Sequence, residues 1–187
     1  RARPLVDLGH VHFAFYSQLI MRDAREAQDG FVAELALAGR QAHVLNLSAA
    51  FPRRDSFAIV REERHGWLAG ELERLPIPLA VMCDDDRRAL ELVVACGLAG
   101  LRVPEDVAVL GCDNHWVEQR LSPISLSTVD MNHKGIGWKA ASGLDQLMQG
   151  ALPPSDVIKV PPVGVVARHS TATFITDSPA VTAAVVH

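Results

Sequence analysis

Residues 79–114, LAVMCDDDRRALELVVACGLAGLRVPEDVAVLGCDN, contain the pattern that decides the fold. A short apolar run at 79–83 is followed by a helical pattern at 87–100 and, after a turn at Pro104, by a second apolar run that ends at Cys112. Continuous apolar strands separated by an amphipathic helix are typical of a parallel sheet covered on both faces. The stretch therefore predicts a βαβ unit within an α/β fold. The helix is expected to bury a face formed by Leu90, Val93, Val94 and Gly97.

The same alternation of strands and helices extends in both directions along the chain. Toward the amino terminus it predicts strands at 12–17 and 41–47 and helices near 23–39 and 60–74. Toward the carboxy terminus it predicts a strand within 123–130, a helix at 132–149 and two strands at 157–160 and 163–169. We therefore expect an open parallel sheet with helices on both faces.

Two helices of this pattern carry tryptophan, and one carries a long apolar stripe. Trp67 and Trp138 lie on predicted helices and are expected in the core or at an interface. The helix at 132–149 repeats small and apolar residues at helical spacing, which predicts a buried face. Its members are Ile136, Ala140, Gly143, Leu144 and Leu147.

The composition is that of an ordinary globular domain. The chain has 187 residues, 49% hydrophobic and 21% charged, which suits one domain or one domain with part of a second. No apolar run reaches the roughly 18 residues that suggest a membrane span. The net charge of −4, with no basic run longer than a pair, argues against a nucleic-acid surface on these residues. DNA is therefore expected as a partner only through a domain absent from this sequence.

The three cysteines are Cys83, Cys96 and Cys112. Their odd number and unpaired spacing predict free thiols in a reducing compartment, and hence a cytoplasmic protein. The sequence begins RARPLVDLGH without a methionine. We expect it to be a fragment or a processed product, from which a leader peptide can have been lost.

Polar side chains follow several of the predicted strands at their carboxyl ends. Ligands of open parallel sheets bind in the crevice beyond these strand ends. Carboxylates there accept hydrogen bonds from hydroxyl groups, hold a hard metal ion or cap the following helix. The residues in this position are Tyr16, Ser17, Asn46, Asp84, Asp85, Asp86, Asp113, Asn114, His115 and Trp116.

The aspartates at 84–86 allow two interpretations. One of them can cap the following helix while others favour its positive end. Three in a row exceed what one cap needs, so the spare acceptors can hold hydroxyl groups of a sugar or polyol. Asp113 follows Asp85 by one strand–helix–strand unit, so both are expected to face one crevice from neighbouring strands, as ligand contacts.

The residues after Asp113 suggest how a sugar ring is held. Trp116 can offer an apolar face to a ring, and Asn114 can supply a donor and an acceptor. The alternative for Trp116 is simple packing under a loop. His115 has no neighbour that makes it a base, and it is interpreted as a loop histidine.

Catalysis has little support in the sequence. Cys83, Cys112 and His115 follow adjacent strands, but no CxxC or HxxxH spacing supports a zinc site. The aspartates resemble the magnesium-binding acids of receiver domains, although the order of the elements differs and no lysine ends a later strand in the required place. No GxSxG, HExxH, P-loop or GxGxxG motif occurs. We predict no catalytic residue, no metal ligand and no cofactor.

Three segments carry a family resemblance, namely 83–114, LSPISLSTVDMNHKGIGWKAASGLDQLMQG at 121–150 and VPPVGVVARHST at 160–171. Together they resemble the effector-binding core of LacI/GalR-type transcription regulators. Within that family the chain is most similar to the xylose operon regulators, which join such a core to a C-terminal AraC-type helix-turn-helix domain. The resemblance runs from about residue 10 to 172 and is weaker over 18–75.

The resemblance implies a periplasmic-binding-protein-like fold with two lobes, between which the chain crosses three times. Residues 1–172 are then the effector-binding core. The C-terminal lobe comprises 11–128 and 158–170, and 130–150 is the returning segment of an otherwise incomplete N-terminal lobe. Residues 173–187 are expected to be a linker toward the missing DNA-binding domain.

The resemblance also implies a binding site. Asp113 matches the family's acceptor of sugar hydroxyls, and Asp85-Asp86 match a pair that is usually Asn-Asp or Thr-Asp. An acceptor-only carboxylate at Asp85 therefore replaces a neutral side chain. Many relatives have an arginine where this chain has Ala27, with Arg25 two residues away. The predicted ligand-binding set is Ser17, Arg25, Asp85, Asp86, Asp113, Asn114 and Trp116.

These observations favour a ligand-sensing domain of a sugar-responsive transcription regulator, expected to be a homodimer that binds a small sugar between its lobes. One alternative is a periplasmic sugar-binding protein for transport, which the free cysteines and the helix-like tail disfavour. The other is a magnesium-dependent phosphotransfer or hydrolytic domain that uses the aspartate cluster.

Overall fold

The computed structural model describes residues 3–18, 22–52, 54 and 58–173. Within this part of the chain, six strands form one sheet in the order β2-β1-β3-β4-β5-β6. β1 to β5 are parallel to one another, and β6 is antiparallel to β5. The bounds are β1 (His12–Ser17), β2 (Ala42–Asn46), β3 (Leu79–Cys83), β4 (Val107–Cys112), β5 (Ser127–Asp130) and β6 (Gly164–Val166). The predicted α/β fold is confirmed, with a mixed, mostly parallel sheet.

Helices connect these strands; those at 22–37, 61–72, 86–98 and 133–148 match the predicted helices, whereas the other helices were not predicted. The helices are α1 (Arg3–Asp7), α2 (Arg22–Leu37), α3 (Leu47–Ala50), α4 (Arg61–Leu72), α5 (Asp86–Leu98), α6 (Trp116–Leu121) and α7 (His133–Met148), followed by the short 3-10 helix η2 (His169–Thr171). No helix in the described residues combines the length and apolarity that crossing a membrane would need.

Both faces of the sheet are buried at its central strands β1, β3 and β4, which explains why β3 and β4 are continuously apolar. Alternate residues of β1 serve different cores: Phe13 and Phe15 lie in one cluster with Phe31 of α2. Ala14 and Tyr16 lie in the other cluster, to which α4 and α5 contribute. Side chains of successive strand residues point to opposite faces, so a parallel strand with helices on both sides has no polar face. The expected helices on both faces are therefore present.

The buried face predicted for the helix of the βαβ unit is correct only in part. Val93 of α5 is buried and Leu90 is half-buried, but Val94 and Gly97 are exposed, and Leu92 is fully buried instead. Periodicity alone could not fix the phase, because the small and apolar residues at 92–98 are continuous over two turns of this helix. Contacts with α4 and β4 select the buried face instead.

A second correction concerns residues 157–160, which form no strand. The VIKV segment lies between proline pairs at 153–154 and 161–162, and proline cannot donate to a strand ladder. The predicted strand at 163–169 is present in a shorter form as β6. It pairs with β5 through Val165 and Val166.

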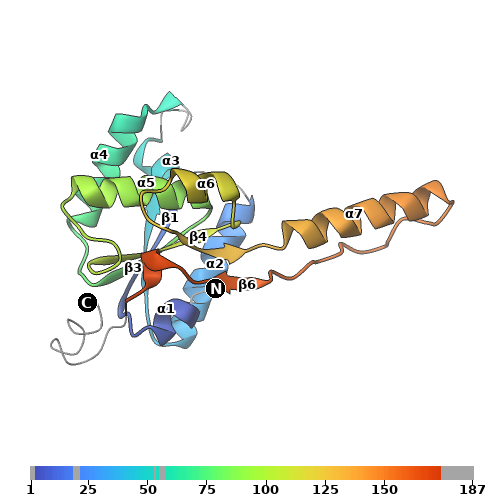
Figure 1. The fold of residues 1–187 in the computed structure, drawn as a ribbon, viewed down its shortest axis with the longest axis horizontal. Helices are drawn as coiled ribbons and strands as arrows, with labels where there is room; N and C mark the ends of the chain where they lie inside the picture. The colour runs from blue at the N-terminus through green and yellow to red at the C-terminus, as the bar shows by residue number, and fades with distance from the viewer. Residues whose placement is uncertain (1–2, 19–21, 53, 55–57, 174–187) are drawn as a thin grey trace.

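Helix α7 and the segment that returns from it project away from the rest of the molecule (Figure 1). The predicted buried stripe is therefore not buried in this structure: Ile136, Leu144 and Leu147 are exposed. Trp138 is also exposed, so its placement in the core is wrong and an interface role stays a prediction. Nothing else in the described part of the chain covers this face. Trp67 packs against the core as expected.

The division of residues 1–172 into two lobes stays a prediction. The predicted linker at 173–187 lies outside the described residues from 174 onward.

Candidate ligand-binding site

The carboxyl ends of β1 to β4 lie along one edge of the sheet because these strands are parallel. The register pairs Ser17 with Asn46 and Tyr16 with Cys83, so the polar residues that end β1, β2 and β3 are neighbours. Helices α3 and α6 follow β2 and β4 at this edge (Figure 1). Parallel sheets bind their ligands at this edge.

The turn after β4 has an uncommon backbone. Asp113 and Asn114 have φ values of 102° and 56°, in the region that non-glycine residues rarely adopt. Asp113 N–H donates to Val129 O at 2.9 Å, and Asn114 N–H donates to Thr128 Oγ1 at 3.1 Å. These bonds to β5 hold the turn in place. Such strained turns cluster at ligand sites, where the surrounding structure maintains them.

Asp86 supports this turn from the first turn of α5. Its side chain is buried, Oδ1 accepts the Thr128 hydroxyl at 2.6 Å, and Oδ2 accepts His115 N–H at 2.8 Å. Burial raises the pKa of Asp86, while the hydrogen bonds from Thr128 and His115 oppose that shift. Asp86 thus positions the loop that carries Asp113. Both of its oxygens are occupied in this structure, and a direct contact with a ligand stays a prediction.

The close packing of Asp86 requires a glycine at 111. A Cβ at Gly111 would lie 2.2 Å from Asp86 Oδ1, and that oxygen is fixed by Thr128. We predict that Gly111→Ala lowers the free energy of unfolding by about 1–3 kcal/mol, the usual cost of overpacking. Urea denaturation measures this loss. Gly66→Ala on α4 is the control, because an added Cβ there meets nothing within 4 Å. Equal stability of the two variants would contradict the prediction.

Asp85 caps α5 and still presents a carboxylate to solvent. Its Oδ1 accepts the backbone N–H of Arg88 at 2.6 Å and lies 3.7 Å from Arg88 Nε. The side chain is 42% exposed. Capping, one of the two interpretations of the aspartates at 84–86, is therefore realised by Asp85. The cap uses one oxygen, and no hydrogen bond to the other is recorded within the described residues.

Asp113 is half-buried and interacts with the first residue of α7. Its Oδ1 lies 3.3 Å from His133 Nε2. Burial raises the pKa of Asp113, the hydrogen bond and charge of His133 lower it, and the charge of Asp85 raises it again. That Asp85 and Asp113 face one crevice stays a prediction. Sequence reasoning did not identify His133, because nothing around it indicates a partner in a distant loop.

Asn114 is held by two partners that are distant in sequence. Its Nδ2 donates to Asp130 Oδ2 at 3.2 Å, and its Oδ1 accepts from Arg168 Nη2 at 2.8 Å. Arg168 also donates to Leu126 O at 2.7 Å. The Asn114 amide therefore ties the turn to the strands beside it. The role of Arg168 could not be read from the sequence, since only the fold brings it to this loop.

Trp116 opens α6 and is 68% exposed, so the alternative of simple packing under a loop does not hold. The guanidinium of Arg120 lies 5.9 Å from the centre of its ring. His115 is exposed and bonds through Nδ1 to Glu118, as a loop histidine would. Trp116 is thus largely exposed at the start of α6, with Arg120 over one face of its ring.

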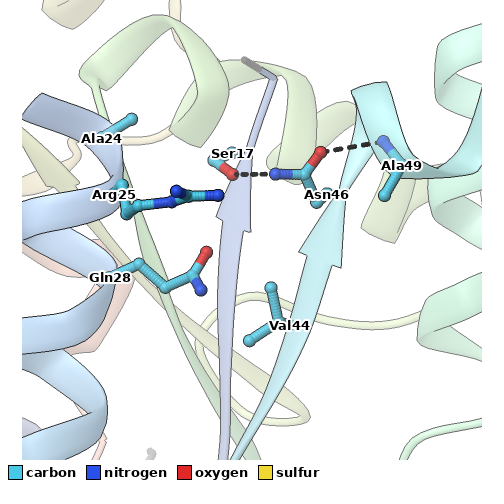
Figure 2. Close-up of a pocket in the computed structure, with 7 residues that line it drawn as sticks. All are labelled: Ser17, Ala24, Arg25, Gln28, Val44, Asn46 and Ala49. Atoms are coloured by element: carbon cyan, nitrogen blue, oxygen red, sulfur yellow. Dashed lines mark hydrogen bonds between the residues drawn. The ribbon is translucent and has the colours of Figure 1, made fainter. Parts of the chain in front are cut away.

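Ser17 and Arg25 lie apart from the aspartates and line a cavity of about 140 Å³. Figure 2 shows Arg25 and Gln28 extending from α2 toward the ends of β1 and β2. The full lining is Ser17, Ala24, Arg25, Gln28, Val44, Asn46 and Ala49. Complete small-molecule sites typically measure about 300–1,000 Å³, so this cavity suits one part of a ligand. Gln28 was not predicted, since no local pattern singles it out.

Asp84 is a further acidic group between β1 and β3. Its backbone N–H donates to Tyr16 O at 3.1 Å, and its buried Oδ1 has no hydrogen-bond partner in the described residues. Burial, with the negative charge of Asp85, raises the pKa of Asp84 to about 7. The sequence placed Asp84 at a strand end but gave no reason to choose it over its neighbours.

The alternatives that require a metal gain no support from the geometry. Within the described ranges, no three histidine, cysteine or acidic side chains gather as metal ligands would. Cys83 and Cys112 are buried free thiols. Burial raises the pKa of Cys83 well above its ordinary value, which keeps the thiol protonated.

The predicted site residues lie at different points along one edge. Asp85 and Asp113 have partly exposed carboxylates at the ends of β3 and β4, Asp86 and Asn114 hold the turn after β4, and Trp116 is exposed at the start of α6. Ser17 and Arg25 line the separate cavity at β1 and β2. The aspartates do not line that cavity, and one hollow shared by all the predicted residues stays a prediction.

Comparison with known proteins identifies the fold and its relatives. A family model described as a periplasmic binding protein-like domain matches residues 2–171. The xylose operon regulatory protein of Haemophilus influenzae is 32% identical over 139 residues, which are 64% of this chain and 36% of that protein. The solved structure of the xylose-binding transcription activator XylR gives a TM-score of 0.81 at 28% identity, over 96% of this chain and 47% of that one.

A dimeric Lac repressor structure gives a TM-score of 0.72 at 24% identity, over 91% of this chain and 58% of that one, and shows the shared fold. The chain spans less than half the length of both xylose regulators. The predicted resemblance to the effector-binding cores of LacI/GalR-type regulators, and to xylose regulators among them, is confirmed. The chain belongs to the periplasmic binding protein-like domain family.

Proposed function

We propose that this chain is the sugar-sensing part of a transcription regulator. In this proposal a small sugar binds at the carboxyl edge of the sheet, and the bound state alters DNA binding by a further domain of the whole protein. The relatives support a regulatory role, because they are transcription regulators with this ligand-binding fold. The chain itself is proposed to have no catalytic activity and to work in the cytoplasm.

One observation carries the proposal: Asp85 and Asp113 lie at adjacent strand ends with partly exposed carboxylates. Each keeps an oxygen to which no hydrogen bond is recorded in the described residues. Ionised carboxylates only accept hydrogen bonds, and sugar hydroxyls donate them. The exposed Trp116, three residues after Asp113, is proposed to offer an apolar face on which a sugar ring can stack.

The connection between Asp113 and α7 suggests how binding is transmitted. Two crossing segments join α7 to the sheet, and they are bonded to each other through Asn132 Nδ2 and Pro161 O at 3.1 Å. Val163 N–H also donates to Asp130 O at 2.9 Å. A ligand that takes Asp113 away from His133 changes the contacts at the base of α7. A ligand that favours one orientation of α7 by about 1.4 kcal/mol changes the ratio of the two orientations tenfold.

The exposed apolar face of α7 fits this mechanism. We propose that Ile136, Leu144 and Leu147 pack against the rest of a second lobe in the whole protein, so that α7 moves with that lobe. The sugar would then be held between the lobes, as the family resemblance implies. We further propose that the whole protein acts as a homodimer.

We predict that Asp113→Ala abolishes stabilisation by sugar. A ligand that binds only the folded state stabilises it by about 2.7 kcal/mol at 100 times its dissociation constant. The measurement is thermal unfolding of the chain with and without D-xylose and a panel of other aldoses. The wild-type chain should melt at a higher temperature with its sugar, whereas Asp113→Ala should not respond.

Asp7→Ala is the matched control, because Asp7 lies on α1, away from this edge, and within the described residues it pairs with Arg3 at the surface. It should respond to sugar as the wild type does. An unchanged sugar response in Asp113→Ala would overturn the proposed site. A response to Mg²⁺ in place of aldoses would favour a phosphotransfer or hydrolytic domain.

A further inference from the structure

The cavity between β1 and β2 presents hydrogen-bond donors. Asn46 uses both ends of its amide within the protein: Nδ2 donates to Ser17 Oγ at 3.2 Å, and Oδ1 accepts Ala49 N–H at 3.0 Å. Because the Ser17 hydroxyl already accepts a hydrogen bond, its own hydrogen is available to a ligand. The end of β1 therefore offers a donor to the cavity.

Arg25 adds positive charge to these donors. Its guanidinium extends from α2 toward Ser17, with Gln28 beside it (Figure 2). No ion pair or hydrogen bond of the Arg25 side chain is recorded in the described part of the chain. None of the lining residues is acidic. A guanidinium has five N–H donors and no acceptor, so its natural partner is a group that only accepts.

We propose that this cavity binds a carboxylate or phosphate substituent of the sugar, so that the effector is a sugar acid or a sugar phosphate. This inference rests on the proposed function and names the ligand class of the same edge. Hydroxyl groups face the acceptor-only Asp85 and Asp113, and the anionic group faces Arg25 and Ser17. The β1 end of this edge thus recognises the anionic group of the ligand, and the end at β3 and β4 recognises its hydroxyl groups.

The spacing of the strands agrees with such a ligand. β1 and β4 are separated by β3, so Ser17 and Asp113 lie about two strand spacings apart, or about 10 Å. A pyranose ring is shorter than this span, and a substituent outside the ring is needed to reach both ends. Binding the anion at β1 also keeps it away from Asp85 and Asp113, whose charges would repel it.

Sugars that differ only at C6 test the inference directly. We would titrate the chain by isothermal calorimetry with D-glucose, D-glucuronate and D-glucose 6-phosphate, with the matching galactose series, D-xylose and inorganic phosphate. The expected result is that an anionic sugar binds at least about tenfold tighter than its neutral partner. High salt should reduce this preference, because the ion pair is partly exposed.

The variant Arg25→Gln separates the two ends of the site. It should lose at least about tenfold in affinity for the anionic sugar and much less in affinity for the neutral sugar. Arg40→Gln is the control, since Arg40 is an exposed arginine outside the cavity. An Arg25→Gln variant that binds the anionic sugar as well as Arg40→Gln does would overturn the inference.

The panel also separates this inference from the proposed function. Tighter binding of neutral aldoses than of their anionic partners overturns the inference alone and leaves a sensor of neutral sugars. If inorganic phosphate binds as tightly as the sugar phosphates do, the sugar adds nothing to binding, and the inference that one ligand contacts both the cavity and the aspartates is overturned. Failure of every sugar to bind overturns both.

Discussion

Glu91→Ala should destabilise this protein more than any surface substitution does, and should lower the free energy of unfolding by about 3–5 kcal/mol. Glu91 is a buried carboxylate on α5 that holds two buried arginines. It accepts from Arg64 Nη2 at 2.9 Å and from Arg88 Nη1 at 2.7 Å, and Tyr16 donates its hydroxyl to it at 3.2 Å. Denaturation in urea at neutral pH measures the loss.

The size of this effect comes from the charges that remain. Arg64 and Arg88 have side chains only 11% and 3% exposed, and without Glu91 they are buried cations without their main counterion. Removing one partner of a buried ion pair leaves the desolvation cost of the other in full. Arg88 also lies 3.7 Å from Asp85, so the loss should extend to the acidic edge.

Two further variants separate charge from packing. Glu91→Gln keeps the shape and one acceptor, and it should lose less than Glu91→Ala. Glu71→Ala removes an ion pair with Arg74 on the surface of α4, and it should cost less than about 1 kcal/mol. If Glu91→Ala and Glu71→Ala were equally stable, the buried network would contribute nothing and the prediction would be wrong.

The centre of the sheet could be predicted from the sequence because β1, β3 and β4 are buried on both faces. Residues 12–17 and 79–83 were placed correctly, since mainly apolar runs of this length are typical of strands and too short for most helices. The buried face of α5 could be predicted only in part, because the continuous small and apolar residues at 92–98 cover two turns of this helix. Residues 157–160 were misplaced because a β-rich composition says nothing about whether a partner strand is present.

The sequence predicted where the candidate site residues lie better than it predicted what each side chain does. Strand ends identified Asp85, Asp86 and Asp113, but consecutive aspartates look alike in a sequence. Which one caps, which one is buried and which one faces solvent depends on the direction of each side chain. Partners such as Arg168 were not predictable, since it lies 54 residues from Asn114 and no periodicity connects them.

His10 should make the protein lose stability as the pH falls below neutral. Its side chain is 2% exposed, and neither ring nitrogen has a hydrogen-bond partner in the described residues. Burial lowers the pKa of His10 from 6.5 to about 4. The folded protein therefore keeps His10 neutral while the unfolded chain takes up a proton. The stabilisation is complete above about pH 6.5, falls between pH 6.5 and 4, and its loss reaches about 3 kcal/mol.

A single pH curve would not isolate this effect, because Asp84 acts in the opposite direction. Its pKa is raised to about 7, so the folded state binds a proton there more readily than the unfolded chain and gains stability as the pH falls. Subtracting the free energy of unfolding of His10→Phe from that of the wild type removes this contribution, since Asp84 is present in both. Measured by urea denaturation, this difference in free energy should change by about 3 kcal/mol between pH 7 and pH 4. His43→Gln, at an exposed histidine of β2, should follow the wild-type curve, and the same would be true of His10→Phe if burial did not hold His10 neutral.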